Sequence, residues 1–256
     1  MDKNNWIPLW SLVRRETVRV LRIWTQSIIP PILTSSLFIV IFGAAIGSHV
    51  PTVGGVSYLS FIVPGLLMMG IIMSSYAATS FSLFIQKFHG SIQELLVSPI
   101  SYWQIIWGLT MGAVVRALLV AIGIVVVSAI LTPMSVAHVG ALIFFALMTT
   151  LLFAFAGIVT ALWANNFDQM NVFLTFVITP LTYLGGIFYS IGSLPEPWRT
   201  VASFNPIVYI IDGFRYGFLG TSDISIWYSV LIVSVLTVGF FLLSVHLFRK
   251  GYKIRS

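Results

Sequence analysis

The chain has 256 residues, of which 58% are hydrophobic and only 8% are Asp, Glu, Lys or Arg, and its formal net charge is +6. Soluble domains carry about 25% charged residues, so a chain this poor in charge cannot cover a water-facing surface and is predicted to be an integral membrane protein. About six spans of roughly 20 residues would fill half of it, which leaves no room for a large soluble catalytic domain.

Several kinds of site are absent from the sequence. There is no cysteine, which excludes disulfides, thiolate catalysis and Cys-ligated metals. None of the lysines follows a glycine, so the chain has no Walker A phosphate loop and cannot bind ATP by that device. The histidines lack ligand spacing, and no Ser-His-Asp or paired-carboxylate pattern occurs. We expect no metal, no cofactor and no catalytic residue in this chain.

The first predicted element is an amphipathic helix over residues 1–25. Apolar and aromatic side chains recur there at helical spacing: Trp6, Leu9, Trp10, Val13, Thr17, Val20, Leu21 and Trp24. The arginines fall mostly on the other side: Arg14, Arg15, Arg19 and Arg22. Tryptophans on one face and arginines on the other are typical of a helix that lies along the membrane surface. The alternative is a juxtamembrane segment without fixed structure.

Hydropathy predicts six transmembrane helices after this segment. They cover approximately residues 27–47, 58–81, 103–130 and 139–163, a span that starts near Asn171, and residues 227–248. Two runs without any Asp, Glu, Lys or Arg, residues 23–86 and 224–248, are far too long for core helices of a soluble fold.

Residues 86–100, between the second and third spans, predict a short helix in a loop. Ser91 fits an N-cap with Glu94 three residues later, a capping-box pattern, and Pro99 ends the run. Apolar side chains would project from this loop: Phe88, Ile92, Leu95 and Leu96. They could enter a groove of a partner protein, or they could pack on their own bundle.

Arg116 is the one formal charge near the middle of a predicted span. Gly108, Gly112 and Arg116 recur every fourth residue, which places the arginine on a close-packing stripe. An arginine at the bilayer centre costs roughly 2.5–3.5 kcal/mol, so this one should either bond carbonyls of a neighbouring helix or face a transport path. No Asp or Glu lies in the middle of a span, which argues against a proton- or sodium-coupled transporter.

Residues 181–220 consist of short apolar and aromatic pieces broken by Gly, Pro and Asn. Apolar segments of about 10–14 residues indicate re-entrant or interfacial helices, and the alternative is an ordered, aromatic-rich external cap. The aromatic side chains here could line a translocation path or outer gate, or could anchor the chain at the membrane interface. They are Phe188, Tyr189, Phe214 and Tyr216.

The basic residues predict the orientation of the chain. They concentrate at the two chain ends and at Lys87, whereas Arg199 and Arg215 fall on the opposite side if the spans alternate. Because loops rich in Lys and Arg stay inside, both termini should be cytoplasmic. The positive charge is therefore explained by membrane topology, and no nucleic-acid partner is expected.

Five runs of sequence carry a resemblance to a known family. They are residues 61–66 (FIVPGL), 93–99 (QELLVSP), 179–190 (TPLTYLGGIFYS), 205–209 (NPIVY) and 213–220 (GFRYGFLG). Through them the chain resembles, over essentially its whole length, the membrane subunit of ABC-2-type ATP-binding cassette exporters. Residues 1–256 would then form a single ABC-2 transmembrane domain of the bacterial inner membrane.

The resemblance implies an all-α fold with an N-terminal interfacial helix, six transmembrane helices, and two short re-entrant helices between the fifth and sixth. It implies a homodimer in membrane lipid that docks two copies of a separate ATPase subunit, which binds the ATP and Mg. The segment from Gly90 to Pro99 would be the coupling helix, with Glu94 at its acidic position and Arg15 sharing in docking. The substrate would be a drug, a lipid-linked glycan or another amphiphile.

Two functions from other classes compete with this one. A self-contained channel or secondary transporter would predict an inverted repeat or a carboxylate-lined path, and the sequence has neither. A membrane-embedded enzyme acting on lipids would need a His, Asp or Cys constellation at the interface, and none occurs.

The orientation can be tested with single cysteines, because the natural chain has none. A cysteine at Glu196 should react with an impermeant maleimide added to the outside of intact cells, since residues 195–199 are predicted to be external. Lys3→Cys should react only after the cells are opened. Labelling of the Glu196→Cys variant from the cytoplasmic side alone would overturn the topology.

Overall fold

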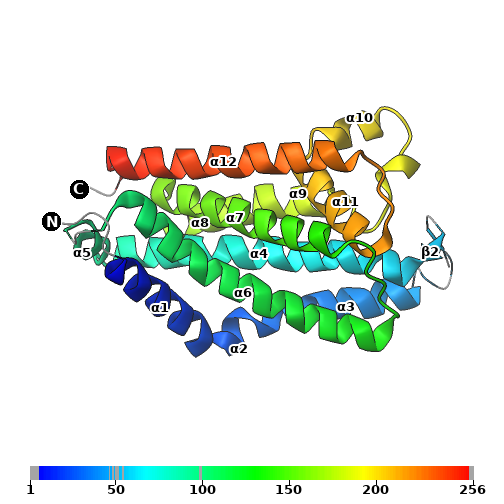
Figure 1. The fold of residues 1–256 in the computed structure, drawn as a ribbon, viewed down its shortest axis with the longest axis horizontal. Helices are drawn as coiled ribbons and strands as arrows, with labels where there is room; N and C mark the ends of the chain where they lie inside the picture. The colour runs from blue at the N-terminus through cyan, green and yellow to red at the C-terminus, as the bar shows by residue number, and fades with distance from the viewer. Residues whose placement is uncertain are drawn as a thin grey trace.

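The computed structural model describes residues 6–45, 47, 49, 52–53, 55–97 and 100–253, apart from the side chains of Ala44, Glu94 and Leu96. Within these residues the chain is an elongated bundle of helices (Figure 1). It opens with α1 (Ile7–Arg22), α2 (Trp24–Ser27) and α3 (Ile29–Ala45). The N-terminal segment therefore has a fixed helical structure, as the amphipathic pattern predicts.

A small hairpin follows, in which β1 (Thr52–Val53) pairs antiparallel with β2 (Val56–Ser57). The remaining elements are α4 (Tyr58–Phe88), α5 (Ile92–Val97), α6 (Tyr102–Leu131), α7 (Val139–Trp163), α8 (Phe167–Phe173), the π-helical η1 (Leu174–Ile178), α9 (Thr179–Tyr183), the 3-10 helix η2 (Ile191–Ser193), α10 (Trp198–Ser203), α11 (Pro206–Leu219) and α12 (Ile226–Lys250). The start of α1, the end of α12 and α5 lie at one end of the bundle, and β2 and α10 lie at the other (Figure 1).

In the described part of the chain, five helical segments are long and apolar enough to cross a membrane: residues 24–43 together with α4, α6, α7 and α12. Five of the predicted spans coincide with them. The predicted fifth span is instead a shorter rod made of α8, η1 and α9. Pro180 has no N–H to donate one turn back, and just before it the backbone bonds in the wider π pattern, from the N–H of Thr179 to the carbonyl of Leu174.

Helix α4 forms the centre of the bundle. In a continuous apolar stretch of 18 residues along α4, 89% of the residues are buried, against 17% in such a stretch of α12 and 22% in one of α6. A helix that is apolar on all sides, as α4 is between Phe61 and Ile72, is stable only when other helices surround it. The outer helices α6 and α12 keep one face for α4 or α7 and leave the other exposed, as lipid-facing helices do.

Small residues set how closely α4 approaches α7. A side chain at Gly157 would collide with Thr79 Oγ1 and would lie 2.6 Å from the carbonyl oxygen of Tyr76. At the same contact Thr79 Oγ1 donates a hydrogen bond of 2.8 Å to the carbonyl of Ala154. Close backbone approach at small residues, joined by a hydroxyl bond, is a common way to hold helices together in lipid.

Gly157→Ala should therefore destabilise the bundle. The added methyl group meets the backbone of α4 as well as Thr79 Oγ1, and the backbone cannot move aside easily, so we expect a loss of about 1–3 kcal/mol, as for overpacked cores. Gly140→Ala is the matched control on the same helix, because a Cβ there has open space, and it should be neutral or slightly stabilising. Thermal unfolding of the purified proteins in detergent measures both, and equal midpoints would contradict the proposed contact.

Candidate functional site

The predicted helix of the 86–100 segment is present as α5, at one end of the bundle. Gly90 has φ of +73°, a left-handed conformation that suits glycine and lets the chain turn from α4 into α5. Ser91 Oγ donates to the carbonyl of Gln86, which ties the turn to the end of α4. Pro99 and the side chains of Glu94 and Leu96 lie outside the described residues, so their predicted roles stay predictions.

The apolar side chains of this segment divide into two groups. Ile92 and Leu95 are only 3% and 9% exposed, and they are buried by the rest of this chain. The expectation that these two project outward was therefore wrong, and the alternative of packing on their own bundle holds for them. Phe88 is 65% exposed and Val97 is 87% exposed. Phe88 and Val97 are therefore the exposed apolar side chains that flank α5, and we call the surface that they form the α5 surface.

Glu16 holds helix α1 against α4 through a hydrogen bond from Ser82. The Glu16 carboxylate is fully buried, accepts from Arg19 Nη2 at 2.8 Å and Ser82 Oγ at 2.7 Å, and so joins α1 to α4. Arg15 Nη2 donates to Gln86 Oε1 at 2.8 Å while its side chain stays half-exposed. Sequence reasoning missed Glu16, because one acid among four arginines has the pattern of a solvated helix face.

The glycine stripe of α6 has its partner in α1. A Cβ at Gly108 would collide with Leu12, and one at Gly112 would lie 3.0 Å from Glu16 Cβ. The predicted close-packing face is therefore confirmed. The buried residues of α1 are Leu12, Glu16 and Val20, one turn apart, whereas Trp6, Trp10 and Trp24 remain exposed.

Arg116 continues the same stripe and reaches a neighbouring segment. Its Nε donates to the carbonyl of Ser27 at 3.1 Å, where α2 ends just before α3. This is the carbonyl anchor that the sequence offered as one of two interpretations. The same side chain also lines a cavity of about 290 Å³, so the second interpretation is compatible with the first.

The four aromatic residues predicted for an outer path occupy different places. Phe188 stacks on Phe42 with ring centres 4.4 Å apart, and Tyr216 stacks on His138 at 4.5 Å. Tyr189 donates from its hydroxyl to the carbonyl of Leu184 and lines an apolar cavity of about 440 Å³. Phe214 is buried in the main core against Phe218, so its predicted place on a path is not supported.

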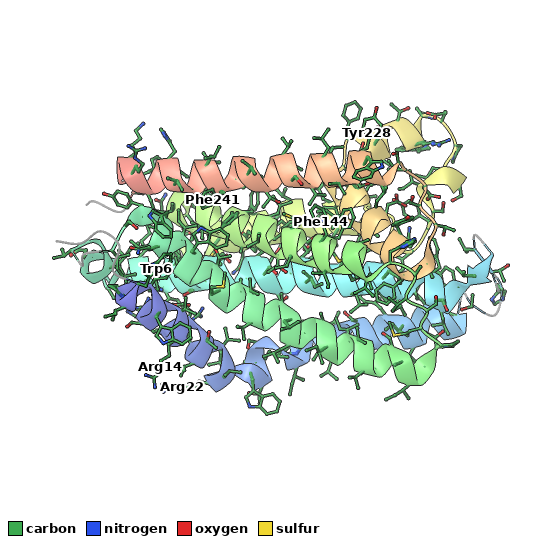
Figure 2. All side chains as sticks on the ribbon, in the orientation of Figure 1. Trp6, Arg14, Arg22, Phe144, Tyr228 and Phe241 are labelled. Atoms are coloured by element: carbon green, nitrogen blue, oxygen red, sulfur yellow. The ribbon has the colours of Figure 1, made fainter. Side chains whose placement is uncertain are left out.

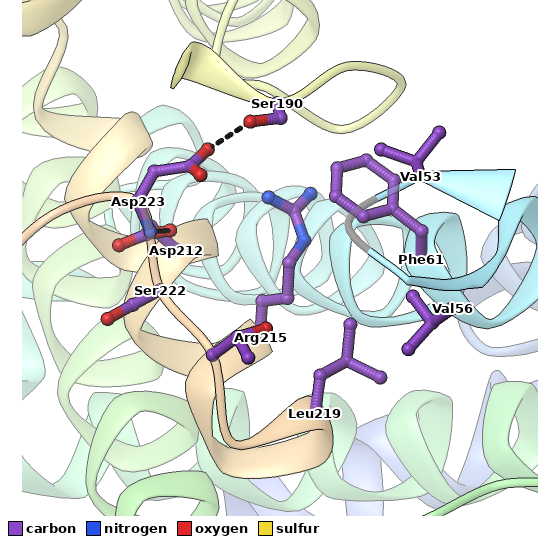
Figure 3. Close-up of a pocket in the computed structure, with 10 residues that line it drawn as sticks. Val53, Val56, Phe61, Ser190, Asp212, Arg215, Leu219, Ser222 and Asp223 are labelled. Atoms are coloured by element: carbon purple, nitrogen blue, oxygen red, sulfur yellow. Dashed lines mark hydrogen bonds between the residues drawn. The ribbon is translucent and has the colours of Figure 1, made fainter. Parts of the chain in front are cut away.

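A polar pocket at the end of the bundle opposite α5 was not predicted (Figure 3). Arg215 is buried, donates from Nη2 to the carbonyl of Gly186 at 2.7 Å, and holds its guanidinium 3.9 Å above the ring of Phe61. The Asp212 carboxylate accepts from the backbone N–H groups of Asp223 and Ile224. Together they line a cavity of about 140 Å³.

The charges in this pocket act as fasteners between segments. Asp223 accepts from Ser190 Oγ at 2.6 Å, so the loop before α12 is bonded to the loop after α9 (Figure 3). The sequence predicted the side of the membrane for Arg215 from the alternation of the spans, but it did not predict that α11 buries the side chain.

Arg215→Met should destabilise this end of the bundle, because the carbonyl of Gly186 would lose its hydrogen-bond donor and the ring of Phe61 would lose the cation above it. We expect a loss of about 1–3 kcal/mol, which is typical when a buried partner is removed. Arg215→Lys keeps the charge but lacks the planar guanidinium, so its loss of stability should lie between zero and that of Arg215→Met. Arg199→Met, at an exposed position of α10, is the control and should stay within about 0.5 kcal/mol. Detergent-based unfolding compares them, and equal losses at both arginines would refute the fastening role.

Comparison with known proteins agrees with this architecture. The sequence model of the ABC-2 type transporter family matches residues 8–219. The chain is 42% identical over 254 residues to the inner membrane transport permease YadH of Escherichia coli strain K12, with 98% of each chain covered. It is 26% identical over 251 residues to nodulation protein J of Rhizobium leguminosarum biovar viciae, which covers 96% of this chain and 94% of that relative. The chain belongs to the ABC-2 type transporter family.

Proposed function

We propose that this chain is the permease subunit of an ATP-driven exporter that moves an amphiphile outward, and that the α5 surface docks a separate ATPase subunit. The observation that carries the proposal is the exposure of Phe88, the last residue of α4, and of Val97, the last residue of the short helix α5, at one end of the bundle. Exposed apolar side chains at a helical turn are what a partner's groove recognises.

The energy source is expected to lie outside the chain. The sequence has no Walker A loop, and permeases of this family normally work with an ABC ATPase partner. In our proposal two copies of the chain form the pore and two ATPase subunits bind ATP and Mg. Arg15 contributes to docking from α1, where its half-exposed side chain lies beside the end of α4.

The proposed topology has six crossings and both termini in the cytoplasm of a bacterium, with the chain in the inner membrane. The rod formed by α8, η1 and α9 is the remaining crossing, and α10 and α11 are the re-entrant pair. The burial of α11 supports this arrangement, since Ile207, Ile210 and Ile211 are buried in the main core while α10 has no buried residue. A broken helix at membrane depth needs such protein surroundings.

The outer path is proposed to run past Phe188, Tyr189 and Tyr216, without Phe214. Tyr189 borders the apolar cavity of about 440 Å³, together with Leu184 and Trp198. An apolar cavity of this kind accommodates the hydrocarbon part of an amphiphile.

Docking is tested by copurification of the ATPase with the tagged permease. Phe88→Ala should lower the recovered ATPase several-fold and leave the permease folded, because the ring is 65% exposed. Phe204→Ala is the matched control, since that ring is 84% exposed but belongs to the opposite end of the bundle. Glu94→Arg adds a charge reversal on α5 and should weaken docking or uncouple hydrolysis from transport. Full recovery of ATPase with both α5 variants would refute the docking surface.

A further inference from the structure

Arg116 lines a cavity whose chemistry the carbonyl anchor does not explain. The cavity, of about 290 Å³, lies where α2 and α3 meet α4, α6 and η1. Its polar lining includes Gln26, Thr34 and Ser74, and its apolar lining includes Met69, Met73 and Leu174. One cavity therefore presents a cation, hydroxyl and amide groups, and hydrocarbon.

No acidic side chain in the described part of the chain forms an ion pair with Arg116. Among the described side chains, the ion pairs within 4.0 Å are those of Glu16 with Arg15 and Arg19. Arg116 donates a hydrogen bond from Nε to the carbonyl of Ser27, and its guanidinium has further N–H groups in a planar fork. A half-buried cation without a counter-charge is costly in a membrane protein, and an anionic ligand would offset that cost.

The depth of the cavity follows from helix lengths and from α1. Helix α6 has 30 residues, so it is about 45 Å long and exceeds a hydrocarbon core of about 30 Å. The half of α6 before Arg116 is covered by α1, whose exposed Arg14 and Arg22 point away from the bundle (Figure 2). Exposed arginines belong at headgroup level or in water and not in hydrocarbon.

Arg116 consequently lies near one membrane boundary and not at the bilayer centre. About 23 Å of α6 remain from Arg116 to Leu131, which is most of a hydrocarbon thickness. In the topology proposed above, this boundary is that of the inner leaflet. The cavity thus places its guanidinium where the head of an inner-leaflet amphiphile would lie, with Met73 and Leu174 available to its chain.

We propose that the Arg116 cavity binds the anionic head of an amphiphile, a phosphate or similar oxyanion, at the inner leaflet. Guanidinium groups bind such oxyanions through paired, charge-assisted hydrogen bonds. The inference rests on the proposed export function and deepens it, because it names the class of substrate that would enter. Binding at this cavity requires only the permease, so it can fail while ATPase docking succeeds, and the reverse also holds.

The test is a binding titration on the purified chain in neutral dodecyl maltoside micelles, read by native mass spectrometry. Dodecyl phosphate is the amphiphilic probe, and inorganic phosphate is the free anion. We expect dodecyl phosphate to bind wild type, and Arg116→Gln to raise its dissociation constant about tenfold or more. Arg116→Lys keeps the charge without the fork and should give an intermediate loss. Arg22→Gln removes an exposed charge that does not line the cavity, and it should change the constant less than twofold.

A second variant covers the case in which Arg116→Gln does not fold. Ala77→Phe fills the cavity from α4, leaves Arg116 unchanged, and should also lose dodecyl phosphate. Retention of wild-type binding by folded Arg116→Gln or by Ala77→Phe would overturn the proposal. An equal loss in Arg22→Gln would overturn it as well, because binding would then follow net charge. Equal affinity for inorganic phosphate would refute the amphiphile as ligand, since the cavity would recognise the anion alone.

Discussion

The burial of α4 on all its sides is the constraint on which the rest of the fold depends. Because lipid tails are as apolar as the side chains of α4, hydrophobicity alone cannot hold other helices against it. Close fit and hydrogen bonds must do so, and they occur where Gly157 lets α7 approach and where Thr79 bonds across the contact. Helices α3, α6 and α11 complete the surroundings of α4.

Buried and half-buried charged side chains form hydrogen bonds between the packed helices at several positions along the bundle. Glu16 joins α1 to α4, Arg116 joins α6 to the junction of α2 and α3, and Arg215 joins α11 to the loop after α9. Lys87 acts at the end of α7, where its Nζ donates to the carbonyls of Leu162 and Ala164. The last carbonyls of a helix lack intrahelical donors and carry partial negative charge, so a lysine satisfies them in both respects. For Glu16, Arg215 and Lys87, a backbone group or a second charge helps to offset the cost of desolvation.

These fasteners also connect the proposed sites mechanically. The α5 surface begins at Phe88, the last residue of α4. Two residues before it, Gln86 accepts a hydrogen bond from Arg15 of α1. Helix α1 in turn packs along the glycines that lead to Arg116. If a docked partner displaced α5 and α1, the contacts of these helices would also displace α4 and α6, which line the Arg116 cavity. Such a route through packed helices is a physical basis for coupling between an ATPase and a membrane cavity.

The membrane class, five of the spans, the amphipathic N-terminal helix, the short helix at residues 92–97 and the glycine face of α6 could all be predicted from the sequence. These features depend on local hydropathy, helical period and turn residues, which act within one or two turns of the chain. Which side chains of those helices are covered depends instead on how the helices pack, and this became clear only from the structure. From the sequence, Leu95 was expected to project from a loop and Phe214 to line a path or lie at the membrane interface, yet neighbouring helices bury both side chains. Glu16, Asp212 and Arg215 look like surface charges, yet they are buried because their partners come from segments distant in sequence or from the backbone of another loop. Hydropathy records how costly a side chain is to bury, whereas the partner that offsets this cost is set by the packing of the whole bundle.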